Sequence, residues 1–193
     1  MSSCCEQCGE RLEIKVSGPS ARYCSGKCRQ RAYRRRCKQQ LPARMRQLDR
    51  WTVADGKRPV TACGAPASST DASTWGSYEQ VSSRPHGIML GGGIACIDLD
   101  HCINGRGQLA PWASEIINAA PGAVVERSMS GRGLHVFGLL PEAPGRRRGH
   151  AEVYSRARFI RTTENIYRPG RLVDLEPAVK KLNALARAGD IPT

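Results

Sequence analysis

The stretch IACIDLD, residues 94–100, decides how this chain is interpreted. It is an apolar, β-branched run preceded by three glycines at 91–93, which is the pattern of a turn leading into a buried strand. Side chains alternate between the two faces of a strand, so Asp98 and Asp100 are expected to lie on the same face. Two carboxylates held that close repel each other, and burying them without a cation is costly. The stretch therefore predicts a central strand that carries a divalent-metal site.

The remainder of the chain is organised around this strand. Residues 1–37 form a cysteine- and arginine-rich module, 38–50 a connector, 51–174 the main domain and 175–193 a helical tail. Within the main domain, periodicity and turn residues predict strands over 87–90, 94–100, 124–128, 134–140, 151–154 and 159–163, and helices over 75–81 and 111–120. Strands predominate after the second helix, which indicates an α+β fold with helices on one face of a sheet.

Positive charge is concentrated at the start of the chain. The 193 residues carry a formal net charge of +13, and residues 1–50 hold 13 Lys/Arg against 4 Asp/Glu. This uneven balance favours a polyanionic partner, most simply nucleic acid, over the alternative of a solvated charge run. The chain has neither an apolar run of membrane-spanning length nor a signal segment, so we expect a soluble protein with reduced thiols and no membrane partner.

Four cysteines near the start have the spacing of a zinc site. Cys5 and Cys8 form one pair, and Cys24 and Cys28 form another after fifteen intervening residues. Tetrahedral zinc takes four thiolates, and two such short turns supply them. Cys4 can replace Cys5, so the sequence leaves the identity of the first ligand open. We predict a structural Zn²⁺ site in this module.

The segment after the last of these cysteines, RQRAYRRR at 29–36, predicts a helix with arginine on several faces. Together with Cys24 and Cys28 it resembles a small treble-clef or ribbon-like finger of bacterial and phage proteins. In such modules a basic helix beside the zinc can lie against phosphates. The alternative is a purely structural zinc staple whose arginines stay in water. Cys37 has no partner in the pattern and is expected to be a spare thiol.

Two features downstream of the aspartates add to the candidate site. His135 follows the glycine-containing loop SMSGRG at 128–133, and Glu152 lies in the predicted strand 151–154. Glycines in such a loop allow backbone N–H groups to approach an anion closely. Each piece alone has a plainer explanation, as a solvated loop, a turn, a core histidine or a surface carboxylate. Their order and spacing together favour metal-dependent phosphoryl transfer on nucleotides.

Three ordered motifs resemble those of the archaeo-eukaryotic primase superfamily, in its phage and plasmid primase–polymerase branch. They are IDLDHC at 97–102, SMSGRGLHV at 128–136 and EVY at 152–154 with Arg158 and Phe159 after it. The resemblance covers about residues 51–163. It implies a primase–polymerase (RRM-like) catalytic domain that joins NTPs or dNTPs on a single-stranded DNA template with Mg²⁺ or Mn²⁺. It further implies a separate replicative helicase as partner, and phage or mobile-element replication in the bacterial cytoplasm.

The resemblance also implies a role for each motif residue. Asp98, Asp100 and Glu152 would hold the catalytic metal, and His135 would complete the catalytic set. The residues implied to contact the nucleotide are Ser128, Ser130, Gly131, Gly133, His135 and Arg158. The chain departs from the family pattern at Glu164, where relatives have glycine, and in having its zinc module ahead of the catalytic domain.

Two other functions compete with this interpretation. The first is a non-catalytic zinc-finger DNA-binding or regulatory protein on a degenerate primase scaffold. The intact pair of Asp98 and Asp100 argues against it, because a decayed site has no reason to retain adjacent charges. The second is a metal-dependent nuclease, which the loop at 128–133 disfavours because cleavage needs no triphosphate pocket.

Overall fold

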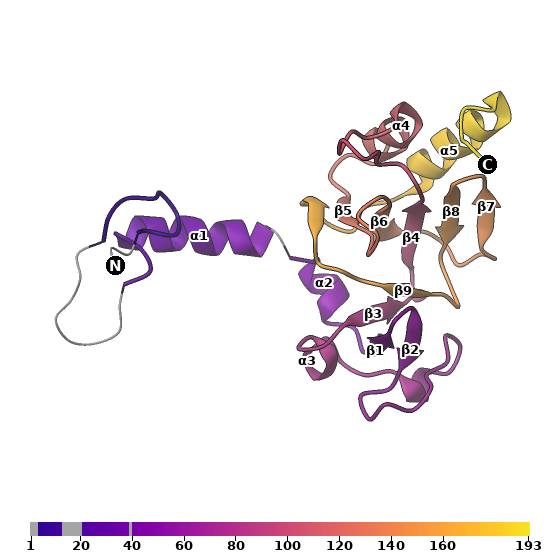
Figure 1. The fold of residues 1–193 in the computed structure, drawn as a ribbon. Helices are drawn as coiled ribbons and strands as arrows, with labels where there is room; N and C mark the ends of the chain where they lie inside the picture. The colour runs from indigo at the N-terminus through magenta and orange to yellow at the C-terminus, as the bar shows by residue number, and fades with distance from the viewer. Residues whose placement is uncertain (1–3, 13–20, 39) are drawn as a thin grey trace. The chain divides into compact units, whose positions relative to one another are not determined.

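The computed structural model describes residues 4–12, 21–38 and 40–193, with only the backbone described for 34–38. The chain divides into two compact units, Met1–Gln40 and Leu41–Thr193, which we call the cysteine unit and the sheet unit. Figure 1 gives the order of their helices and strands. No helix in the described ranges is long and apolar enough to cross a membrane.

The cysteine unit consists of cysteine-bearing turns and one helix, α1 (Gly26–Lys38). The Ser25 hydroxyl accepts a hydrogen bond from the Cys28 N–H at 3.2 Å, which satisfies one of the free donors at the start of the helix. The buried side chains described in this unit are Cys5, Cys28 and Ala32. The described side chains of this unit therefore bury little apolar surface, and a metal cross-link would add to its stability. The side chain of Cys37, the expected spare thiol, lies outside the described residues.

Two antiparallel sheets form the sheet unit. The larger has the order β10 (Ile166–Arg168), β5 (Val124–Arg127), β6 (Leu134–Leu139), β4 (Ile94–Leu99), β8 (Ala151–Tyr154), β7 (Arg146–Arg148). The smaller has the order β2 (Arg58–Val60), β1 (Trp51–Asp55), β3 (His86–Met89), β9 (Phe159–Arg161). The predicted α+β class is confirmed, and Ile94–Leu99 is an inner strand of the larger sheet, although the strand predicted over 94–100 ends at Leu99 and Asp100 lies in the turn after it.

The two longest helices of the sheet unit cover one face of the larger sheet. Pro111 opens α4 (Pro111–Asn118), and the left-handed Gly189 follows α5 (Glu176–Ala188). Trp112, Ile116 and other apolar side chains of these helices share one buried cluster with alternate residues of the strands, such as Ile97. The short segments α2 (Ala43–Arg46), η1 (Ala72–Thr74) and α3 (Tyr78–Val81) lie in the connections before β3.

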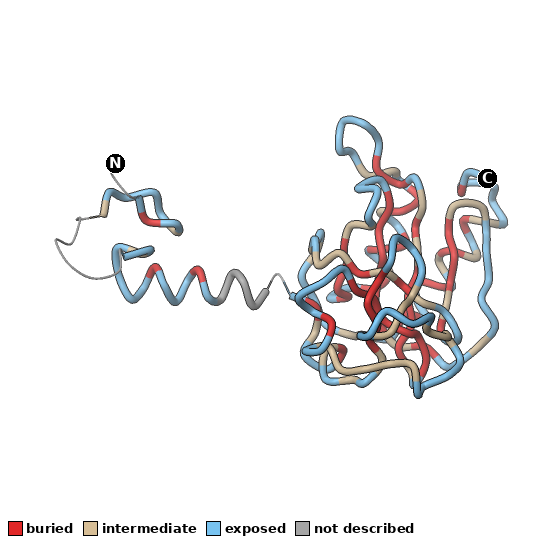
Figure 2. The backbone as a smooth tube through the Cα atoms, turned by 60° about the horizontal axis from the view of Figure 1, so that its bottom comes forward, coloured by how far each residue is buried: buried red, intermediate tan, exposed pale blue. Residues whose placement is uncertain are grey.

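The other face of the larger sheet changes character from one row of side chains to the next. One row aligns Val124, Phe137, Cys96 and Tyr154 across β5, β6, β4 and β8. This row packs with Trp51 and Ile88 of the smaller sheet in a second apolar cluster. The next row, two residues further along each strand, aligns Glu126, His135, Asp98 and Glu152. Figure 2 shows that the buried residues of this unit are concentrated in its interior.

Several element bounds differ from the sequence prediction. The strand predicted over 124–128 ends at Arg127, and the helix predicted over 75–81 begins only at Tyr78. Arg146–Arg148 carries no strand pattern in sequence but forms the edge strand β7, with all three arginines exposed. An edge strand pairs on one side only, so neither apolar alternation nor burial is needed to hold it.

Candidate functional site

Four cysteine sulfurs form a group that can hold a structural metal such as zinc. The Sγ atoms of Cys5, Cys8, Cys24 and Cys28 all lie within 4.8 Å of one another. Cys24 Sγ lies 3.5 Å from both Cys8 Sγ and Cys28 Sγ. Cys4 is exposed and does not belong to the group, so packing selects Cys5 from the two ligands that the sequence left open. Four thiolates at this spacing match tetrahedral Zn²⁺.

Ionisation of the cluster is uneven. Burial acts to raise the pKa of Cys5, but hydrogen bonds from the backbone of Cys24, Gln7 and Cys8 lower it to about 6. Hydrogen bonds with Cys8 and Cys28 raise the pKa of Cys24 to about 12. Deprotonation of Cys24 is therefore unfavourable beside these neighbouring thiols, and a bound cation would favour its thiolate.

The three sequence motifs of the sheet unit meet in the charged row. Asp98 lies in the middle, aligned with His135 on one side and Glu152 on the other. Directly aligned residues of antiparallel strands project from the same face with their Cβ atoms about 5 Å apart. Register alone therefore brings together residues that lie up to 54 positions apart in the chain.

Asp98 is the residue of this row that is poised for a cation. Its Oδ1 atom is buried and has no hydrogen-bond partner among the described residues. Nε2 of His135 lies 3.8 Å from this oxygen. Burial raises the pKa of Asp98, and the charge of Asp100 adds to this against the opposing charge of His135. A hard divalent cation, which prefers carboxylate oxygens, fits this orphaned oxygen.

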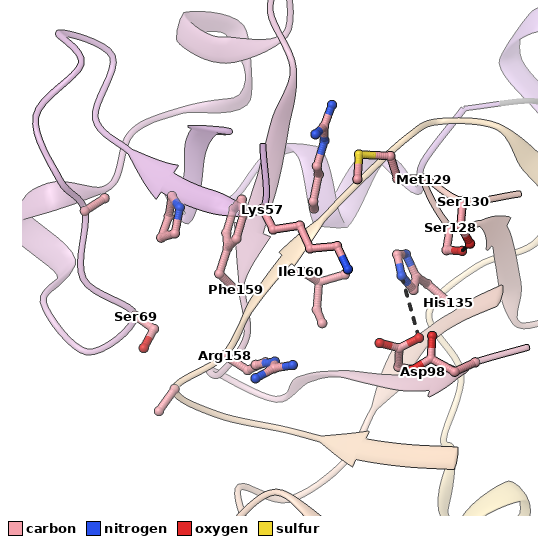
Figure 3. Close-up of a pocket in the computed structure, with 15 residues that line it drawn as sticks. Lys57, Ser69, Asp98, Ser128, Met129, Ser130, His135, Arg158, Phe159 and Ile160 are labelled. Atoms are coloured by element: carbon pink, nitrogen blue, oxygen red, sulfur yellow. Dashed lines mark hydrogen bonds and ion pairs between the residues drawn. The ribbon is translucent and has the colours of Figure 1, made fainter. Parts of the chain in front are cut away.

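A cavity of about 570 Å³ opens over the row (Figure 3). Asp98 and Asp100 both line it, while Lys57 and Arg158 extend from the other side towards Asp98 and His135. The full lining comprises Lys57, Pro59, Ala67, Ser69, Asp98, Asp100, Ser128, Met129, Ser130, His135 and residues 157–161. Carboxylates and cationic side chains thus face one cavity, which suits a ligand that combines phosphates with a metal ion.

The loop between β5 and β6 contributes hydroxyl groups to the cavity. Ser128 and Ser130 line it, and their Oγ atoms lie 3.2 Å apart. Gly131 and Gly133 are not among the lining residues, because their N–H groups bond to the Ser128 carbonyl and hydroxyl oxygens at 2.9 and 3.1 Å. A Cβ on Gly133 would lie 2.8 Å from the Ser128 hydroxyl and 2.9 Å from the Leu99 carbonyl. The glycines therefore shape the loop, and the serines face the ligand space.

Glu152 lies beside Asp98 but its oxygens are engaged. The Tyr154 hydroxyl donates to Oε2, the Nε of Arg147 lies 3.3 Å from Oε1, and Nη2 of Arg158 lies 3.9 Å from Oε2. Glu152 is also absent from the cavity lining. Over the described ranges, the group of metal-ligand candidates that gathers within 4.8 Å is the cysteine cluster and not these carboxylates. The structure therefore brings Asp98 and Asp100 to the cavity, whereas Glu152 lies outside the lining and is held by Tyr154 and Arg147.

Sequence reasoning missed Glu126. Its side chain is fully buried, and its Oε1 accepts a hydrogen bond from Nδ1 of His135 at 2.9 Å. Burial acts to lower the pKa of His135, but the hydrogen bond to Glu126 and the charges of Glu126 and Asp98 outweigh it and raise the pKa. The available signal was a carboxylate in the predicted strand 124–128, on the same face as Val124 and opposite to Val125.

Glu164, the departure from the family motif, does not line the cavity. It adopts a left-handed backbone with φ of 55°. Its Oε1 accepts a hydrogen bond from the Tyr78 hydroxyl and lies 3.3 Å from Nε2 of the buried His86. The side chain therefore ties the segment after β9 to the smaller sheet.

No family model matches this chain, and no curated protein matches it in sequence.

Proposed function

We propose that the sheet unit is a metal-dependent nucleotidyltransferase that binds a nucleoside triphosphate in the cavity over Asp98. One observation carries the proposal: two carboxylates, one with a buried unpartnered oxygen, share a cavity with three cationic side chains. Those cations are Lys57, Arg158 and Arg161. A triphosphate with its metal ion needs both kinds of group, since the metal takes carboxylate ligands while the remaining phosphate charge takes cationic donors.

The roles follow from position. Asp98 and Asp100 would hold Mg²⁺ or Mn²⁺, which when bound offsets phosphate charge and activates an attacking hydroxyl group. His135 presents Nε2 to the cavity, and the hydroxyls of Ser128 and Ser130 are further donors for phosphate oxygens. Glu152 would join the metal ligands on release from Tyr154 and Arg147.

The finer assignment, a primase–polymerase acting on single-stranded DNA, draws on the resemblance of the three motifs. Under this proposal, the cysteine unit with its bound zinc contacts the nucleic acid. Arg29 and Arg31 on α1 are exposed, as phosphate contacts require. A separate helicase would supply the single-stranded template, and the setting would be phage or mobile-element replication in a bacterial cell.

Incorporation of nucleotides on unprimed and primed single-stranded DNA tests the proposal. Wild-type protein with Mg²⁺ or Mn²⁺ should form product, and Asp98→Asn should lose at least about 1,000-fold in rate, because the metal loses its buried ligand. The same substitution should leave the melting temperature unchanged or higher, since it removes a buried carboxylate that lacks a partner. Asp190→Asn, at an exposed position after α5, is the matched control. Equal incorporation by wild type and Asp98→Asn would refute the catalytic role.

The engaged state of Glu152 favours a second candidate, a DNA-binding protein without catalysis. With one of three acidic residues held by Tyr154 and Arg147, the carboxylates are not arranged as a metal group. This candidate predicts DNA binding that survives Asp98→Asn, no incorporation by any form of the protein, and no Mn²⁺ binding by the sheet unit.

A further inference from the structure

Glu126 is a fully buried carboxylate with three hydrogen-bond donors around it. Its Oε1 accepts from Nδ1 of His135 at 2.9 Å. Its Oε2 accepts from the backbone N–H groups of Thr163 and Glu164 at 3.1 and 3.0 Å. A buried carboxylate is tolerated only when hydrogen bonds replace its water, and here both oxygens are satisfied within the protein.

The contact determines how the His135 ring is presented. Glu126 Oε1 accepts at this contact, so the ring must carry a proton on Nδ1, and a second proton on Nε2 would make that atom a donor to phosphate. With Nδ1 turned towards Glu126, Nε2 faces Asp98 and the cavity. Alignment of Glu126 with His135 across β5 and β6 places the two side chains next to each other on the same face of the sheet.

The second oxygen of Glu126 ties a separate wall of the cavity to the same point. Thr163 and Glu164 follow β9, whose residues Phe159 to Arg161 line the cavity. The Thr163 hydroxyl also donates to the Arg127 carbonyl at 2.6 Å, next to Glu126 in the chain. The Glu126 carboxylate thus connects His135 on the larger sheet with the segment after β9, the strand that places Arg161 at the cavity.

We propose that Glu126 is a positioning residue, which orients His135 towards the bound triphosphate. This inference rests on the proposed function and adds to it a residue that does not itself line the cavity. Second-layer carboxylates of this kind change the rate through the ring that they orient.

Kinetics in two backgrounds test the proposal. Glu126→Gln keeps the shape of the side chain but places an amide NH₂ where one of the two acceptors is needed. We expect kcat for incorporation to fall about 10- to 100-fold in the wild-type background. In a His135→Ala background the same substitution should cost less than about threefold, because the ring through which Glu126 acts is gone. Equal losses in both backgrounds would indicate a general structural effect and overturn the proposal.

The matched control is Glu115→Gln, which alters an exposed carboxylate on α4 that pairs with Lys181 at 3.2 Å. It should leave kcat unchanged. If this control lowers kcat as much as Glu126→Gln does, the effect of Glu126 is not specific, and the proposal fails.

Long-range ¹H–¹⁵N correlation of the four histidine rings supplies a readout that needs no nucleotide. His135 is assigned by the signal that disappears in His135→Ala. We expect its Nδ1 to be protonated in the wild-type protein and the signal to shift in Glu126→Gln. An Nδ1 without a proton would overturn the proposal, even if Glu126→Gln does not fold. If wild-type protein incorporates no nucleotide, the proposed function fails, and the ring signal alone decides whether Glu126 orients His135.

Discussion

The cysteine unit and the sheet unit are stabilised by opposite means. In the cysteine unit the described buried side chains are two cysteines and one alanine, and four sulfurs gather at one point. The sheet unit buries two apolar clusters, one on each face of its larger sheet. A metal bound by the four cysteines would therefore be the main source of stability in the first unit, whereas in the second the candidate metal site adds an unsatisfied carboxylate to a fold that its apolar clusters stabilise.

The two sites also differ in how the chain builds them. Cys5 and Cys8 lie at one short turn, whereas Cys24 precedes α1 and Cys28 lies near the start of that helix, so each pair is held within a few residues. The charged row exists only when β5, β6, β4 and β8 are paired in register. The cysteine cluster can therefore help to fold its unit, whereas the charged row depends on a sheet that has already formed.

Metal removal should have the largest effect and should act on one unit only. Structural zinc contributes about 10 to 16 kcal/mol of apparent folding free energy in small zinc modules. A strong chelator, or Cys28→Ser, should therefore abolish the NMR signals of folded α1 and leave the melting transition of the sheet unit unchanged. Cys63→Ser, at an exposed thiol of the sheet unit, is the control. If α1 stays folded in metal-free protein, the cysteine unit does not depend on a metal for its stability.

Phe137→Ala should have the next largest effect, now confined to the sheet unit. Phe137 is fully buried and lies in the apolar row that joins the two sheets. Removal of a buried aromatic ring costs about 3 to 5 kcal/mol, measurable by denaturant unfolding. The zinc content should not change, and Met129→Ala, at a half-exposed side chain, should cost less than about 0.5 kcal/mol. Loss of zinc from Phe137→Ala would show that the units are not independent.

The smallest expected effect is a pH-dependent contribution from Glu164 and His86. The hydrogen bond with His86 lowers the pKa of Glu164, so its contribution is lost as pH falls through that lowered value. Burial acts to lower the pKa of His86, but Glu164 raises it overall, so its contribution is lost as pH rises through that raised value. Both groups are charged between pH 4.5 and pH 6.5, which are the ordinary pKa values of the two side chains.

Melting temperatures of wild type and Glu164→Gln should therefore differ most between these two pH values. The corresponding difference in the free energy of unfolding should be less than about 1 kcal/mol, since Glu164 is one-third exposed and partly screened by solvent. Glu79→Gln, at a neighbouring exposed position, should show no such window. The cysteine unit should respond differently above pH 6, because thiolate ligands bind metal more tightly as protons are removed. If wild type and Glu164→Gln differ by the same amount at every pH, the ionisation of Glu164 and His86 is not the cause of the difference.

The strands that sequence predicted correctly are those with buried apolar faces. Ile94–Leu99 and Leu134–Leu139 carry dense runs of apolar residues, and the structure has both as inner strands. Arg146–Arg148 was missed because an edge strand gains its hydrogen bonds from one neighbour and needs no apolar side chain. Local pattern therefore predicted the centre of the larger sheet, but it missed Trp51–Asp55, an inner and largely buried strand of the smaller sheet.

The sequence predicted only those residues of the candidate site that lie in the three motifs. Asp98, His135 and Asp100 could be chosen from the sequence, and the structure brings them to one cavity. The role of Glu126 could not, because its burial arises from pairing with β6 and from the segment at 163–164 folding back over it. The choice of Cys5 over Cys4 likewise depends on which neighbouring thiol turns inward, which spacing does not determine.

The three arginines of β7 have a consequence for the behaviour of the protein at high concentration. This strand is one margin of the larger sheet and pairs only with β8 on its inner side. A free margin of backbone N–H and C=O groups invites another chain to add a strand, which is a common beginning of aggregation. Three adjacent positive side chains in two identical copies repel each other, so β7 keeps this margin from joining sheets edge to edge.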